Sequence, residues 1–307
     1  MKRKILYELR SLYRDDFRVT GLEFGSGEKS VCIVGSVRGN EVQQIYTCSQ
    51  LVKELKEIER RNGICQGHSV LVVPAINSYS MNIGKRFWPT DNTDINRMFP
   101  GYALGETTQR IAAGVFENLK DYKNCIQFAT FYMKGDFANH VRMMKTGYED
   151  VELASKFGLP YVVLRNPMAY DTTTLNYNMQ IWETAAFSLY TKEVEQIDHT
   201  EAMVMVNSVL RFLHAQGIIS TAVEAGVSPV VVETDAMVTL KAEQAGIFRP
   251  IAKVGDRVKQ GDLLAQILDT YEGEVISQVK SPMNGVVFFL HNTPMTYNNT
   301  AVVKLIP

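Results

Sequence analysis

The residue types best suited to chemistry lie in one polar stretch, RFWPTDNTDINRMFPG at positions 86–101. Asn96 and Arg97 stand side by side there and offer an amide and a planar guanidinium fork, which together match a carboxylate. The alternative is structural, with Arg97 and Asp94 forming a local ion pair that braces a surface loop. Residue types alone favour bracing, because most charged side chains are simply solvated.

Nucleophiles and metal ligands are sparse elsewhere. The five histidines are scattered, and the four cysteines, Cys32, Cys48, Cys65 and Cys125, form no CxxC pair. No Ser-His-Asp or Cys-His arrangement with a recognisable local motif is present. In a chain of this size the cysteines are typical of free, mostly buried thiols in a reducing compartment.

The first two-thirds of the chain alternates strand and helix patterns. Short β-branched apolar runs predict buried strands of a parallel sheet at 31–37, 69–76, 125–131 and 161–165. Helix-period segments lie between or after them at 41–61, 107–122, 151–158 and 201–217. This alternation predicts an α/β fold, with a mixed and largely parallel sheet between helices, over residues 1–220.

From about residue 221 the pattern changes to short strands with Gly and Asp turns. Segments 245–267 and 284–306 are two similar halves, each beginning with a strand after a turn glycine, Gly246 or Gly285. Two such halves resemble the barrel-sandwich of biotinyl and lipoyl domains, so residues 221–307 are predicted to form a small all-β domain. The hairpin at 269–277 has Glu274 where those domains carry their cofactor lysine. No attached cofactor is expected.

The wider pattern around the polar stretch resembles a known family. Arg86, Pro89, Asp91, the run Asp94-Ile95-Asn96-Arg97 and Phe99-Pro100-Gly101 have the spacing of the R..P.D..D.NR.FPG signature of the succinylglutamate desuccinylase/aspartoacylase family. The upstream segment PAINSY (74–79) and the order of strands and helices fit as well. The resemblance implies a zinc-carboxypeptidase-like fold. It also implies that Asn96 and Arg97 hold the substrate carboxylate and that Arg86 polarises the scissile carbonyl.

The zinc ligands of that family are largely replaced. The family binds zinc through a His and a Glu in a G-x-H-G-[DN]-E turn and a second His in a D-L-H turn. Here the first turn is Ser36-Val37-Arg38-Gly39-Asn40-Glu41 and the second is Gln127-Phe128-Ala129, so only Glu41 is retained. One carboxylate beside a permanent guanidinium charge is a poor dication site. We therefore expect no cofactor, unless the family's zinc is somehow kept.

The family's general-base glutamate is replaced too. The matching strand, 186–192, has Tyr190 at that position. Glu224 in TAVEAG superficially resembles the motif, but it follows the last long helix and is interpreted as a linker residue. An unorthodox metal site from Glu41, Asp136 and His140 is conceivable, with His140 in the predicted loop 135–143. A lone loop histidine is more often polar surface.

Three classes of function stay open. The favoured one is a degenerate, zinc-less family member that binds a small carboxylate or acyl-amino acid, with Arg38, Arg86, Arg97 and Arg142 around its pocket. In the structural alternative, Arg38 pairs with Glu41 and only fills the space that a metal ion takes in the family. The second class is an active metal-dependent deacylase with a non-standard metal site, and the third is a structural subunit that supports an active paralogue.

Composition limits the partners. Lys+Arg is 32 and Asp+Glu is 33, so a formal charge of −1 recruits neither nucleic acid nor an anionic membrane surface. No apolar run suggests a signal peptide or a membrane span, which favours a cytoplasmic protein. A small anionic metabolite is the expected partner. A homo-oligomer is left open, since related barrel-sandwich tails suggest subunit contact.

Overall fold

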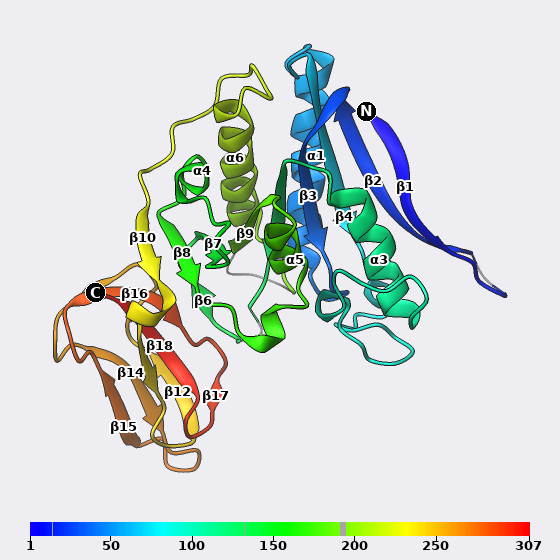
Figure 1. The fold of residues 1–307 in the computed structure, drawn as a ribbon. Coiled ribbons are helices and arrows are strands. Elements are labelled where there is room, and N and C mark those ends of the chain that lie inside the picture. Colours follow the sequence, from blue (N-terminus) through cyan, green and yellow to red (C-terminus); the bar gives the residue numbers. More distant parts are fainter. Residues whose placement is uncertain (14, 132, 191–194) are drawn as a thin grey trace.

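The computed structural model describes residues 1–13, 15–131, 133–190 and 195–307 and shows a large α/β domain followed by a smaller β domain (Figure 1). The large domain is built on a nine-stranded sheet with the strand order β1-β2-β4-β3-β5-β9-β7-β8-β10. Its strands are β1 Lys2–Leu9, β2 Phe17–Gly25, β3 Gly27–Ser36, β4 Gly67–Ala75, β5 Asn124–Ala129, β7 His140–Met144, β8 Tyr161–Arg165, β9 Ala185–Tyr190 and β10 Val230–Glu233.

The sheet is mixed, as predicted. Strands β4, β3, β5 and β9 are parallel neighbours, and β7, β8 and β10 form a second parallel group that runs antiparallel to β9. The first group places the carboxyl ends of β3, β5 and β9 side by side, with Ala129 opposite Tyr190 in the register. Ligand sites in such sheets form at the carboxyl ends of strands.

Helices cover both faces of this sheet (Figure 1). On one face α1 and α6 pack in the hydrophobic cluster that contains Leu51, Leu55, Val209 and Phe212. On the other face α3 and α5 pack in a second cluster. The helical segments are α1 Val42–Arg60, α2 Ser78–Met81, η1 Ile95–Arg97, α3 Thr107–Leu119, α4 Val151–Ser155, η2 Ala169–Asp171, α5 Leu175–Ile181, α6 His199–Ala215 and η3 Thr234–Ala236.

The C-terminal part forms two small antiparallel sheets. One has the order β11-β18-β16-β13, and the other has the order β15-β14-β12-β17. The strands are β11 Val238–Lys241, β12 Gly246–Pro250, β13 Arg257–Val258, β14 Leu263–Leu268, β15 Val275–Lys280, β16 Gly285–Leu290, β17 Met295–Thr296 and β18 Ala301–Ile306. The strands predicted to follow Gly246 and Gly285 are present, and each begins at the glycine itself. An apolar cluster lies between the two sheets.

The two parts of the chain are joined by hydrogen bonds and by packing. Strand β6, Asp136–Phe137, leaves the large domain and pairs with β16. Phe137, Val163, Phe288 and Phe289 share one apolar cluster. Strand β10 lies beyond the predicted boundary at residue 220, yet it pairs with β8 in the large sheet. Apart from β6, the strands of the small sheets therefore all follow Glu233.

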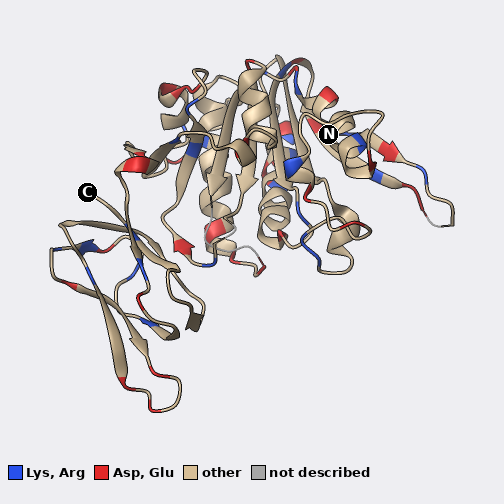
Figure 2. Ribbon diagram, turned by 60° about the horizontal axis from the view of Figure 1, so that its bottom comes forward, with Lys and Arg blue, Asp and Glu red and all other residues tan. Residues whose placement is uncertain are grey.

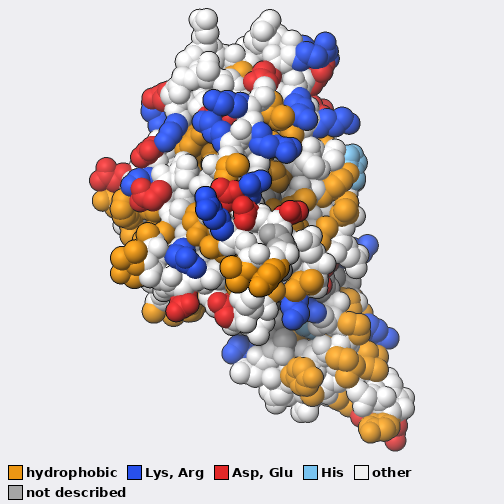
Figure 3. All heavy atoms as spheres, turned by 90° about the vertical axis from the view of Figure 1, so that its right-hand side faces the viewer, with side chains coloured by type: hydrophobic (Ala, Val, Ile, Leu, Met, Phe, Trp, Pro, Cys, Tyr) orange, Lys and Arg blue, Asp and Glu red, His pale blue; other side chains and the backbone are white. Residues whose placement is uncertain are grey.

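Charged residues of both signs are spread over the ribbon (Figure 2), and they are interspersed on the face that Figure 3 shows. None of the helices in the described ranges combines the length and the apolar character that a membrane crossing requires.

Candidate functional site

The turn after β3 places Arg38 and Glu41 inside the domain. The Arg38 side chain is 7% exposed and that of Glu41 only 2%. Glu41 Oε2 accepts hydrogen bonds from the backbone N–H groups of Val37 (2.8 Å) and Arg38 (3.0 Å), which closes the turn. Gly39 fits because a Cβ there would collide with Ser80 and with the carbonyl of Lys85.

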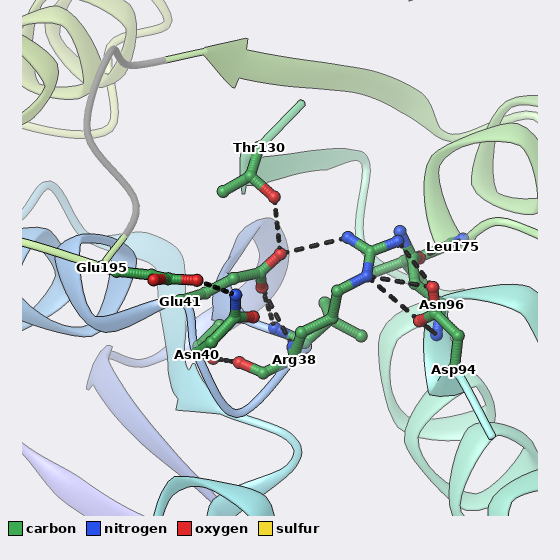
Figure 4. Close-up of polar contacts among 10 residues, drawn as sticks. Arg38, Asn40, Glu41, Asp94, Asn96, Thr130, Leu175 and Glu195 are labelled. Carbon is green, nitrogen blue, oxygen red and sulfur yellow. Dashed lines mark hydrogen bonds and ion pairs between the residues drawn. The ribbon is translucent and has the colours of Figure 1, made fainter. Parts of the chain in front are cut away.

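Arg38 bridges two carboxylates from different segments (Figure 4). Its Nη1 donates to Glu41 Oε1 at 3.1 Å. On its other side, Nε and Nη2 each donate to Asp94 Oδ2 at 3.0 Å. Burial disfavours the charge, but Glu41 and Asp94 outweigh it and raise the pKa of Arg38 above its ordinary value. Arg38 is therefore a permanent buried cation with two carboxylate partners.

This arrangement settles the pairing of Asp94. In the structural alternative, Arg97 and Asp94 form an ion pair, whereas in the structure Asp94 is bonded to Arg38. Asp94 Oδ1 also accepts a hydrogen bond from the backbone N–H of Asn96 at 3.0 Å and so caps η1. Arg97 instead donates from Nη1 to the carbonyl of Tyr170 at 3.1 Å. The predicted contact between Arg38 and Glu41 is present at 3.1 Å.

The positions to which the resemblance assigns the zinc ligands do not form a ligand set here. Both Glu41 oxygens are already occupied, since Oε1 also accepts from Thr130 Oγ1 at 2.8 Å. The Arg38 guanidinium has no lone pair, and Ala129 has no ligand atom at all. Within residues 1–13, 15–131, 133–190 and 195–307, no cluster of three His, Cys, Asp or Glu side chains could hold a metal ion. The residues present do not fit the ion.

His140 does not act as a substitute ligand in this arrangement. It was predicted in a loop but begins strand β7, where its side chain is fully buried. Its Nδ1 donates to the carbonyl of Ala138 at 2.7 Å, and its ring stacks on Tyr190 with centroids 4.8 Å apart. Burial lowers the pKa of His140 to about 3, so the ring is neutral at physiological pH.

Tyr190 forms part of the pocket wall. It ends β9, is 3% exposed, and lies under the Arg142 guanidinium at 4.3 Å from the ring centroid. Burial raises the pKa of Tyr190 although Arg142 opposes that effect. The hydroxyl therefore stays protonated near neutral pH, which does not suit a general base.

A small pocket of about 70 Å³ lies among these residues. Its walls are strongly basic, and the arginines that line it are Arg38, Arg86, Arg97, Arg142 and Arg165. The sequence predicted the first four but missed Arg165, whose only signal was a charged residue at the end of a buried strand. Arg165 is neutralised by Asp171 at 2.9 Å.

Three of these arginines have no carboxylate partner in the described part of the chain. They are Arg86, Arg97 and Arg142. Burial, reinforced by neighbouring arginines, lowers the pKa of Arg86 and of Arg142, as expected for cations that lack compensation. Arg97 and Arg165 lie on the ring of Tyr170, each 5.5 Å from its centroid. The pocket therefore has an excess of positive charge.

Two amides complete the polar lining. The Asn96 carbonyl accepts from the N–H of Leu175 at 3.2 Å, and no described residue accepts from its NH₂ group. The Asn176 NH₂ donates to Ser188 Oγ, while the Asn176 carbonyl oxygen is buried without a partner among the described residues. Guanidinium and amide groups in this arrangement suit a small carboxylate.

Comparisons of sequence match both parts of the chain. The sequence model of the succinylglutamate desuccinylase/aspartoacylase catalytic domain matches residues 27–216, and that of an uncharacterized protein family conserved in archaea matches residues 191–307. The N-alpha-acetyl-L-2,4-diaminobutyric acid deacetylase of Halomonas elongata is 24% identical over 289 residues. That alignment covers 88% of this chain and 79% of the relative.

Solved structures share the fold over nearly the whole chain. A succinylglutamate desuccinylase from Silicibacter sp. TM1040 superposes with a TM-score of 0.80 at 18% identity, covering 100% of this chain and 95% of that one. The product-bound ectoine utilization protein EutE from Ruegeria pomeroyi gives 0.76 at 17% identity, covering 95% and 90%. With the family model matching well over half of its length, this chain belongs to the succinylglutamate desuccinylase/aspartoacylase family.

Proposed function

We propose that this chain is a non-hydrolytic family member that binds a small carboxylate or an acyl-amino acid in the pocket lined by Arg86, Arg97 and Arg142. The observation that carries the proposal is the position of Arg38. Its guanidinium pairs with Glu41 and Asp94 at the turn that, by the resemblance, would carry zinc ligands in this typically zinc-dependent family. Binding groups are thus retained while the hydrolytic groups are replaced.

The electrostatics support an anionic ligand. Arg38 and Arg165 are neutralised by Glu41, Asp94 and Asp171, so the remaining guanidiniums keep their charge for a ligand. Asn96 offers an amide group and Arg97 a planar guanidinium group to a carboxylate. Each charge-assisted hydrogen bond is worth about 1.5–3 kcal/mol, so two or three of them support binding of a small metabolite.

Titration calorimetry with N-acetyl amino acids and dicarboxylates tests the proposal. We expect binding by at least one class, and a loss of about tenfold or more in Arg97→Ala. Arg257→Ala is the matched control, because Arg257 is exposed on β13 in the other domain. Absence of binding by every carboxylate, or equal binding by Arg97→Ala, would contradict the proposal.

The deacetylase from Halomonas elongata favours a second candidate, an active deacylase with a non-standard metal site. Metal analysis of the purified protein and an amide-hydrolysis assay separate the two. Stoichiometric zinc, with activity that disappears in Glu41→Ala, would replace the binding proposal by the hydrolase.

A further inference from the structure

A second cavity of about 430 Å³ lies between the α/β domain and the C-terminal sheets. One wall comes from β8 and the segment around β6, and the opposite wall comes from β16, β18 and the residues around η3. Most of its lining is apolar, and the apolar side chains include Phe131, Met133, Phe137, Val163, Met237 and Phe288. We call it the interdomain cavity.

The interdomain cavity is adjacent to the arginine-lined pocket. Phe131, Arg142, Arg165 and Tyr170 line both of them. Arg142 therefore stands at their junction, with its guanidinium 5.4 Å from the ring centroid of Phe131 and 4.3 Å from that of Tyr190. A molecule whose charged end contacts Arg142 can extend an apolar group into the larger space.

The two volumes favour such an extension. The arginine-lined pocket measures about 70 Å³, well below the volumes that are typical of ligand pockets. A bulky apolar group is therefore better accommodated beyond this pocket. The interdomain cavity, at about 430 Å³, lies within the range of about 300–1,000 Å³ that is typical of ligand pockets.

The charges of the interdomain cavity also favour an anion with an apolar body. Lys304 of β18 stands on the C-terminal wall, and no described carboxylate pairs with it. Asp235, on the same wall, accepts a hydrogen bond from Asn166 at 2.7 Å. Positive charge is thus present beside aromatic side chains, which can contact a planar or branched apolar group.

We propose that the interdomain cavity binds the aromatic or branched acyl group of a carboxylate whose charged end is held at Arg97 and Arg142. This inference rests on the proposed function and adds the ligand class, an acyl-amino acid with a bulky apolar acyl group. It also assigns a role to the C-terminal domain, which supplies Phe288 and Lys304 to the ligand site.

Calorimetry on the unaltered protein tests the ligand class. N-acetylglycine and N-benzoylglycine share a carboxylate and an amide and differ only in the acyl group. We expect N-benzoylglycine to bind at least tenfold more tightly, because its ring leaves water for the apolar cavity. Benzyl alcohol, which has the ring without the charge, should bind far more weakly than N-benzoylglycine.

Met237→Trp tests the place. The larger side chain fills the cavity and should reduce the affinity for N-benzoylglycine to that for N-acetylglycine. Met295→Trp is the matched control, because Met295 is 51% exposed on β17 and lines neither cavity. Thermal unfolding checks that both variants fold, and the comparison of the two ligands on the unaltered protein decides the ligand class without them.

The outcomes separate the two proposals. If N-acetylglycine binds and N-benzoylglycine binds equally or less well, the interdomain assignment is wrong and the carboxylate-binding function stands. If Met237→Trp keeps the full preference for N-benzoylglycine, the ring lies elsewhere and the assignment is also wrong. If no carboxylate binds, the proposed function itself fails.

Discussion

Replacing Arg38 with methionine keeps a long side chain in place but removes the charge between Glu41 and Asp94. Removing one partner of a buried ion pair typically costs about 3–5 kcal/mol, because the other charge stays buried. Glu41 keeps three donors, from the N–H groups of residues 37 and 38 and from Thr130, and the Asp94 side chain is 15% exposed. We therefore expect the lower end, about 3 kcal/mol of unfolding free energy.

Two companion variants separate charge from packing. Arg38→Lys keeps the charge, but one ammonium group cannot reproduce the fork that contacts both carboxylates, so we expect a loss of about 1–2 kcal/mol. The triple variant Arg38→Met/Glu41→Gln/Asp94→Asn has no unpaired charge at this place. It should recover most of the stability, because buried pairs replaced together are often nearly neutral.

Urea unfolding followed by circular dichroism measures these differences, and thermal unfolding gives an independent check. For a domain of about 150–250 residues, 1 kcal/mol shifts the midpoint by about 2–4 °C, so Arg38→Met should unfold about 6–12 °C lower. A loss of unfolding free energy below about 1 kcal/mol in Arg38→Met, or no recovery of it in the triple variant, would refute the view that the buried Arg38 stabilises the domain by pairing with two carboxylates.

Three further outcomes follow from the same site. Zinc content after dialysis, measured by mass spectrometry, should be far below one ion per chain in the unaltered protein. It should rise in Arg38→His/Ala129→His, because this variant adds two imidazoles to the carboxylate of Glu41. One zinc ion per chain in the unaltered protein would contradict this expectation. His140 has a pKa of about 3 in the fold against an ordinary 6.5. The unfolded chain therefore takes up a proton at a higher pH than the folded protein does. For this reason the free energy of unfolding should fall as the pH drops from 6.5 toward 3, by up to about 1.4 kcal/mol per pH unit. In urea unfolding between pH 7 and pH 4, His140→Phe should lack that part of the pH dependence, and an unchanged slope would show that His140 titrates normally. Tyr190→Phe keeps the ring under Arg142 and should bind carboxylates within about threefold of the unaltered protein, whereas a complete loss would mean that the hydroxyl contacts the ligand.

Much of the fold could be predicted because its signals are local. The long helix predicted at 201–217 extends over His199–Ala215, and the strand predicted at 161–165 is β8 with those bounds. Strand β7 was predicted as part of a loop, because five residues such as HVRMM carry little pattern of their own. Its conformation comes from pairing with β8 and β9, partners that are distant in sequence.

For the site, the sequence by itself determined which side chains are available and which are not. Arg38 and Ala129 cannot supply metal ligands in any conformation, and the guanidinium of Arg97 has the geometry to pair with a carboxylate. Only the tertiary structure decided that Asp94, 56 residues from Arg38, is its second partner, and that Arg165 and Tyr170 join the pocket. Likewise, the interdomain cavity exists only because β16 and β18 pack against the large domain. Residue chemistry is fixed by covalent structure, whereas pairing and enclosed space depend on which distant segments the packing brings together.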